Sequence, residues 1–182
     1  LATAVAAFVL KELVHTLQHF ATTAAQRNQY LYLVLPPVGI FATAMIVRYV
    51  VRDDISHGVT KILIALSQRK SRIKPHNMWS SVLSSAITIG MGGSVGAESP
   101  IVLTGAAIGS NLGRFFKMEQ RNLMLLVGCG AAGAIAGIFK APITGLVFVI
   151  EVLLMDLTLV SILPLLTTSV TSASLAYILT GR

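Results

Sequence analysis

The chain has 182 residues, of which 54% are hydrophobic and only 12% are charged, and its mean hydropathy is +0.79. A soluble domain carries about a quarter charged residues, so the composition excludes an ordinary soluble enzyme and indicates a protein that lies largely in a membrane. The net charge of +7 comes from short loops between apolar segments, which the positive-inside rule explains without a nucleic-acid partner.

Apolar segments recur along the whole chain, and several are shorter than the ~20 residues that a simple crossing needs. This pattern predicts an all-α polytopic membrane protein with broken and re-entrant helices. The single cysteine, Cys129, lies within an apolar run and allows no disulfide inside the chain. The apolar runs are residues 1–10, 30–47, 123–138, 143–154 and 157–179.

Residues 1–24 predict one helix with a polar second half. Its start has no basic region and no cleavage site, so we interpret it as part of a longer helix, and the chain as a fragment, rather than as a signal peptide. His15 and His19 are one helical turn apart, and Glu12 is one turn before His15, which is also a metal-ligand spacing. No third strong ligand is nearby, which favours packing or interfacial histidines over a metal site.

A second span is predicted over residues 30–51, with Pro36 and Pro37 near its start. A short helix over residues 58–66 follows and is too brief to cross the membrane. The loop at residues 68–76 is the most basic in the chain and therefore marks the cytoplasmic side.

The centre of the chain is a glycine-rich stretch, residues 90–100, which joins two apolar segments and contains one acid, Glu98. Pro100 suits the first turn of a helix, so we expect a helix to begin near Ser99 with Glu98 at its positive end. A buried break of this kind is how transporters and channels build ion sites. Glu98 is therefore predicted to be functional, the alternative being a helix-capping carboxylate. Four glycines permit a positive φ and close approach of a ligand: Gly90, Gly92, Gly93 and Gly96.

The helix that leaves this break carries Gly105, Gly109 and Gly113 at intervals of four residues, a stripe that allows close helix packing. Another basic loop follows at residues 114–121, consistent with entry and exit on the same side. The chain then enters over residues 123–139, turns at Lys140-Ala-Pro142, and returns over 143–154. Residues 157–179 are long enough to cross outward.

Residues 128–133 match the dinucleotide-binding pattern G-x-G-x-x-G, and Glu151 lies near the position of a ribose-binding acid. The context contradicts this interpretation, because Pro142 and Gly145 interrupt the helix that such a fold requires and no other βαβ unit is present. We therefore expect these glycines to permit close helix packing.

Two stretches resemble the CLC chloride channel and transporter family. Residues 96–100, Gly-Ala-Glu-Ser-Pro, and the helix after them resemble the family's G-[KR]-E-G-P motif. Residues 130–151 resemble its G-A-A-A-G-x-A-A-x-F-x-A-P-x-x-G-x-x-F-x-x-E segment. The resemblance implies a homodimer with one anion pathway per subunit, each subunit being made of two inverted halves. Residues 1–182 match only the N-terminal half of that transmembrane domain, so the C-terminal half is expected to be missing.

By this resemblance, Glu98 corresponds to the gating glutamate, whose carboxylate competes with the permeant anion at a helix N-terminus. Ala97 replaces the family's usual basic residue, which should make the outer mouth less attractive to anions, and Ser99 replaces its usual glycine.

Residues 56–60 align with the family motif G-S-G-I-P, in which the serine hydroxyl coordinates chloride. His57 falls on that serine, so whether Ser56, His57 or Thr60 meets the anion stays open. The anion-binding residues that the resemblance implies are Ser56, His57, Gly58, Val59, Gly96, Ser99, Pro100 and Ile101.

Glu151 matches the first of two acids in the family's proton-coupled exchangers, and Val152 occupies the position of the second. This favours a chloride channel of the voltage-gated type, with passive conduction gated by Glu98. The alternatives are a chloride/proton antiporter and, from another class, a non-transporting membrane scaffold or enzyme. We expect no enzymatic activity, no metal and no cofactor. The expected ligand is chloride or another small anion, and the expected location is the lipid bilayer of a bacterial-type inner or plasma membrane.

Overall fold

The computed structural model describes residues 1–27, 30–51, 58–67, 71–153 and 159–180, and this part of the chain is helical and contains no strand. The predicted all-α fold is therefore confirmed. The helices are α1 (Ala2–Arg27), α2 (Leu31–Ile46), α3 (Gly58–Ser67), α4 (Ser80–Gly90), α5 (Glu98–Phe115), α6 (Gln120–Phe139), α7 (Pro142–Val152) and α8 (Leu159–Thr180). A π-helical turn, Val47–Val51, extends α2, and a 3₁₀ turn, Pro75–Met78, precedes α4.

Within the described ranges, two helices are long and apolar enough to cross a membrane, Gln120–Phe139 and Val160–Thr180. Other helices are apolar but shorter, among them α3, α4, α7 and the Leu33–Tyr49 segment. Prolines lie inside two of the helices, at Pro36 and Pro37 in α2 and at Pro164 in α8. The predicted mixture of long and short apolar helices is thus observed.

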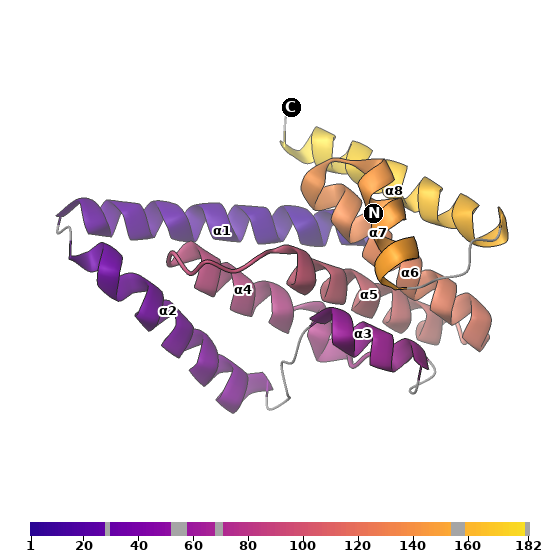
Figure 1. The fold of residues 1–182 in the computed structure, drawn as a ribbon, viewed down its shortest axis with the longest axis horizontal. Helices are drawn as coiled ribbons and strands as arrows, with labels where there is room; N and C mark the ends of the chain where they lie inside the picture. The colour runs from indigo at the N-terminus through magenta and orange to yellow at the C-terminus, as the bar shows by residue number, and fades with distance from the viewer. Residues whose placement is uncertain (28–29, 52–57, 68–70, 154–158, 181–182) are drawn as a thin grey trace.

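Helices α5 and α6 pack together in the centre of the fold, with α1 and α2 extending to one side and α7 and α8 lying at the other (Figure 1). The contact is close because glycines face backbone across it. The α-carbon of Gly105 lies against the carbonyl of Gly130, and that of Gly109 lies against the carbonyl of Leu126. Small residues that let two backbones approach are the usual device for packing helices in a membrane. The predicted packing role of the glycine stripe is confirmed.

The segment after α3 is tied to α5 by buried hydrogen bonds of Ser110. The backbone N–H of Ile73 donates to Ser110 Oγ over 3.0 Å, and this hydroxyl donates to the carbonyl of Ser71 over 2.7 Å. The N–H of Ser71, a residue with φ of 60°, donates to Ala65 O at the end of α3 over 2.7 Å. These bonds hold the C-terminal end of α3 and the segment after it against α5.

Candidate anion site

The break between α4 and α5 spans residues 91–97 and is held by short backbone hydrogen bonds. The N–H of Gly92 donates to Ile89 O over 3.0 Å, and that of Gly93 donates to Thr88 O over 2.8 Å. Of the four glycines expected to allow a positive φ, Gly92 alone adopts one, at 89°. The other three glycines leave room for neighbouring atoms instead. For example, a β-carbon on Gly93 would lie 2.7 Å from Thr88 O.

Glu98 is the first residue of α5, and Pro100 lies in its first turn, as the sequence predicts. Ala97 precedes the helix without a side-chain cap. The side chain of Glu98 is exposed and folds back over Gly96, so closely that a β-carbon at Gly96 would collide with Glu98 Oε2. Glycine at position 96 therefore makes the space that this carboxylate occupies.

The N-terminus of α3 meets the N-terminus of α5. Gly58, the first residue of α3, is buried, and a β-carbon placed on it would lie 2.8 Å from both the carbonyl oxygen and the Oγ of Ser99 and 3.3 Å from Leu103 Cβ. Two residues that are 41 positions apart in the sequence are therefore in direct contact at the two helix starts.

This arrangement concentrates positive partial charge from backbone amides. The amides of a first helical turn have no partner within the helix, and the aligned peptide dipoles place roughly half a positive charge at each N-terminus. Two such ends beside one another, next to a flexible carboxylate, can attract a small anion or hold Glu98 itself in its place.

The structure brings together most of the residues that the sequence implied for anion binding. Gly58 and Ile101 are buried, while Val59, Ser99 and Pro100 are half-buried around the contact. Ser56 and His57 lie outside the described residues.

Glu151 and Val152 lie apart from this contact, near the C-terminal end of α7. Glu151 is exposed and Val152 is half-buried, and both line a shallow pocket of about 350 Å³ formed by α7 itself. The other lining residues are Ile143, Thr144, Val147 and Phe148.

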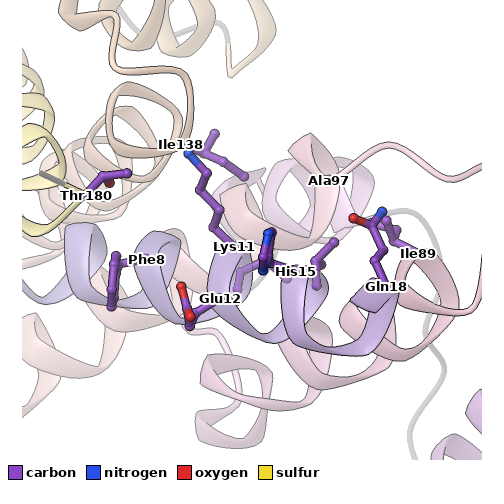
Figure 2. Close-up of a pocket in the computed structure, with 11 residues that line it drawn as sticks. Phe8, Lys11, Glu12, His15, Gln18, Ile89, Ala97, Ile138 and Thr180 are labelled. Atoms are coloured by element: carbon purple, nitrogen blue, oxygen red, sulfur yellow. The ribbon is translucent and has the colours of Figure 1, made fainter. Parts of the chain in front are cut away.

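A second pocket, of about 500 Å³, lies between α1, α4 and the start of α5 and reaches the ends of α6 and α8 (Figure 2). Sequence reasoning missed it. Four of its five polar side chains come from α1, namely Lys11, Glu12, His15 and Gln18, and the fifth is Thr180 of α8. One of its apolar residues is Ala97, the neighbour of Glu98. The spacing of Lys11, His15 and Gln18, one helical turn at a time, is the signal that could have revealed a polar stripe on α1.

The structure also bears on two other sequence patterns, the spaced histidines of residues 1–24 and the glycine pattern of residues 128–133. His15 lines the pocket beside Ala97, whereas His19 is absent from its lining, and the described residues hold no group of three or more potential metal-ligating His, Cys, Asp or Glu side chains. Residues 128–133 lie inside α6, with Gly130 packed on Gly105, which confirms that these glycines serve helix packing.

Comparison with known proteins agrees with this geometry. A family model described as "Voltage gated chloride channel" matches residues 38–182. A ClcB-like chloride channel protein from Ralstonia nicotianae is 28% identical over 159 residues, which is 85% of this chain and 37% of that protein. The H(+)/Cl(-) exchange transporter ClcA of Vibrio cholerae is 38% identical over 64 residues, 35% of this chain and 14% of the transporter.

Among solved structures, a slow cyanobacterial Cl-/H+ antiporter matches with a TM-score of 0.79 at 21% identity. The match covers 100% of this chain and 48% of the antiporter chain, so it shows the fold. The chain thus spans about half the length of the solved structure that it matches, and 37% of the ClcB-like relative.

Proposed function

The chain belongs to the voltage gated chloride channel family, the CLC family of integral membrane proteins, and on this premise we propose that it forms the N-terminal half of a transmembrane chloride pathway. The observation that carries the proposal is the contact between Gly58 and Ser99, which places the N-termini of α3 and α5 together beside Glu98. In the full-length polypeptide, a C-terminal half outside residues 1–182 completes the pathway. Two such polypeptides form a homodimer in a bacterial-type inner or plasma membrane.

In this proposal the anion is held by amides rather than by full cations. Partial charges bind chloride firmly enough for it to enter and weakly enough for it to leave. The binding residues are Gly58 and Val59 in α3 and Ser99 and Ile101 in α5, whereas Pro100 has no N–H and contributes only its fixed helical backbone.

Glu98 acts as the gate. Glu98 is the first residue of α5, and its carboxylate lies over Gly96. Rotation of this one side chain therefore moves a negative charge toward or away from the amides that attract the anion. No cofactor takes part, and chloride is the permeant ligand.

We propose passive conduction, that is, a channel of the voltage-gated type, because Val152 stands where a coupled exchanger of this family has its second acid. A chloride/proton antiporter is the second candidate. It is favoured by the likeness to the Vibrio H(+)/Cl(-) exchange transporter and to the cyanobacterial Cl-/H+ antiporter.

Chloride efflux from proteoliposomes that contain the full-length polypeptide tests the gate. We expect Glu98→Gln to change the initial efflux by about fivefold or more, because neutralising a charge close to a bound ion is worth ~1 kcal/mol or more. Glu119→Gln, which removes an exposed acid at the start of α6, should leave efflux unchanged. Equal efflux from Glu98→Gln and the parent protein would contradict the gate, and efflux from both no faster than from protein-free liposomes would favour a non-transporting scaffold.

The reversal potential under a pH gradient separates the two transport mechanisms. A channel reverses at the chloride equilibrium potential whatever the proton gradient. A reversal potential that follows the proton gradient would show coupled exchange and overturn the passive mechanism.

A further inference from the structure

The pocket beside Ala97 is an elongated space along one face of α1. Phe8, Ile138 and Thr180 lie at one end, and Gln18, Ile89 and Ala97 lie at the other (Figure 2). Its volume of about 500 Å³ is room for roughly 17 water molecules at ~30 Å³ each. A small anion can therefore occupy it together with its hydration shell.

Most of the polar side chains of this pocket lie in the middle of α1. Lys11, His15 and Gln18 recur at steps of four and three residues, so they share one face of the helix, and all three side chains are exposed. Charged groups within a membrane are costly unless they face protein or a water-filled cavity. In a bilayer such a stripe is stable only beside water or a polar partner, and the pocket next to Ala97 offers that space.

The segment that leads to Glu98 has no cation of its own. Residues 91–97 contain no Lys or Arg, and Ala97 stands immediately before the proposed gate. Among the side chains that line the pocket, Lys11 is the one permanent cation. In Figure 2 its side chain extends toward Ile138, whereas the carboxylate of Glu12 points in a different direction.

We propose that this pocket is a water-filled vestibule for a small hydrated monovalent anion, that Lys11 attracts the anion into it, and that His15 and Gln18 provide hydrogen bonds along the way to Ala97. The charge that the segment before Glu98 lacks is supplied from α1. The inference rests on the proposed function, because it concerns how an anion reaches the site at the starts of α3 and α5.

The test is the dependence of efflux on chloride concentration in the full-length polypeptide, with gluconate keeping the ionic strength constant. Lys11→Gln should raise the half-saturating chloride concentration about two- to fivefold, the effect of one unit charge several ångströms away across partly screened water. Lys11→Arg should keep the parent value, and Glu12→Gln should lower it. Arg121→Gln removes an exposed cation at the start of α6, far from the pocket lining, and should change nothing.

The effect of Lys11→Gln should also shrink when an impermeant salt raises the ionic strength from ~20 to ~300 mM, because added salt screens an exposed charge. A side chain that only supports packing would not respond in this way. If Lys11→Gln matches Arg121→Gln at low ionic strength, or if its effect does not depend on salt, the vestibule proposal is wrong.

A failure of the vestibule and a failure of the proposed function give different results. Unchanged efflux in Glu98→Gln contradicts the gate, whatever Lys11 does. Bromide binding to the purified full-length polypeptide, measured by calorimetry at low ionic strength, tests the vestibule even in a protein that passes no anion. There Lys11→Gln should weaken binding about two- to fivefold relative to Arg121→Gln, and equal affinities would overturn the proposal.

Discussion

Gly58 and Ser99 touch where two helices begin: a β-carbon on Gly58 would lie 2.8 Å from the Ser99 carbonyl oxygen and equally close to its Oγ. One of these neighbours is backbone at the start of α5 and cannot move aside alone. The spacing between the N-termini of α3 and α5, and with it the size of the proposed anion site, is therefore set by the absence of a side chain at position 58.

Gly58→Ala should push α3 away from α5. We expect the free energy of unfolding to fall by about 1–3 kcal/mol, the usual cost of overpacking, and chloride efflux to fall with it. Thermal unfolding of the purified full-length polypeptide and proteoliposome efflux measure the two effects.

Gly96→Ala is the matched control for Gly58→Ala. Its added methyl group meets only the end of the Glu98 side chain, which can rotate, so stability should stay close to that of the parent while the gate changes. Equal unfolding midpoints for Gly58→Ala and the parent would show that the two helix starts are not in tight contact.

Gly105→Ala should disrupt the packing of α5 on α6. The new methyl group would meet the carbonyl of Gly130 and the β-carbon of Ala134, and separating two central helices should cost about 1–3 kcal/mol or more. Gly113→Ala, in the same stripe, meets the Cδ1 atoms of Leu123 and Leu126, which can rotate, and should cost less. Thermal unfolding in detergent compares the stabilities of the two variants. A larger loss of stability for Gly113→Ala would contradict the contact between Gly105 and the Gly130 carbonyl.

Local chemistry made much of the fold predictable. Glycines followed by Pro100 mark the break at residues 91–97 and the start of α5, because glycine frees the backbone and proline suits a first helical turn. The spacing of Gly105, Gly109 and Gly113 likewise predicts a helix face that packs closely against another helix. Each of these signals lies within one short stretch of chain.

The site was less predictable because its parts come from distant stretches. No pattern within residues 58–60 shows that they meet Ser99, and only the family resemblance placed them together. The pocket beside Ala97 combines α1 with α4, α5 and the ends of α6 and α8, so its polar stripe on α1 was interpreted as packing or interfacial histidines. The left-handed backbone of Lys140 also has no sequence signal, since lysine does not favour that conformation.

Ser110→Ala should destabilise the connection between α3 and α5. It leaves the N–H of Ile73 and the carbonyl of Ser71 without their buried partner, at a cost of about 1–3 kcal/mol. Ser80→Ala is the matched control, because Ser80 Oγ is buried and has no hydrogen-bond partner within the described part of the chain. Thermal unfolding should therefore show a loss for Ser110→Ala and none for Ser80→Ala, and equal losses would contradict the proposed role of Ser110.

Lys140 forms the turn between α6 and α7 in a left-handed conformation, with φ of 54° and ψ of 31°. Such a conformation costs a residue with a side chain roughly 1–2 kcal/mol, and glycine avoids that cost. The ammonium of Lys140 lies 5.0 Å from the centre of the Tyr177 ring, a cation–π contact worth about 0.5–1 kcal/mol at an exposed site. Glycine and alanine at this position both lose the ring contact, so the two variants differ only in the cost of the left-handed backbone.

We therefore expect Lys140→Ala to be less stable than Lys140→Gly by about 1 kcal/mol, since both variants lose the lysine side chain and only alanine keeps the unfavourable backbone. Unfolding midpoints of the two variants, measured side by side in the full-length polypeptide, check this order. If Lys140→Ala were the more stable variant, a left-handed backbone at the α6–α7 turn would be ruled out.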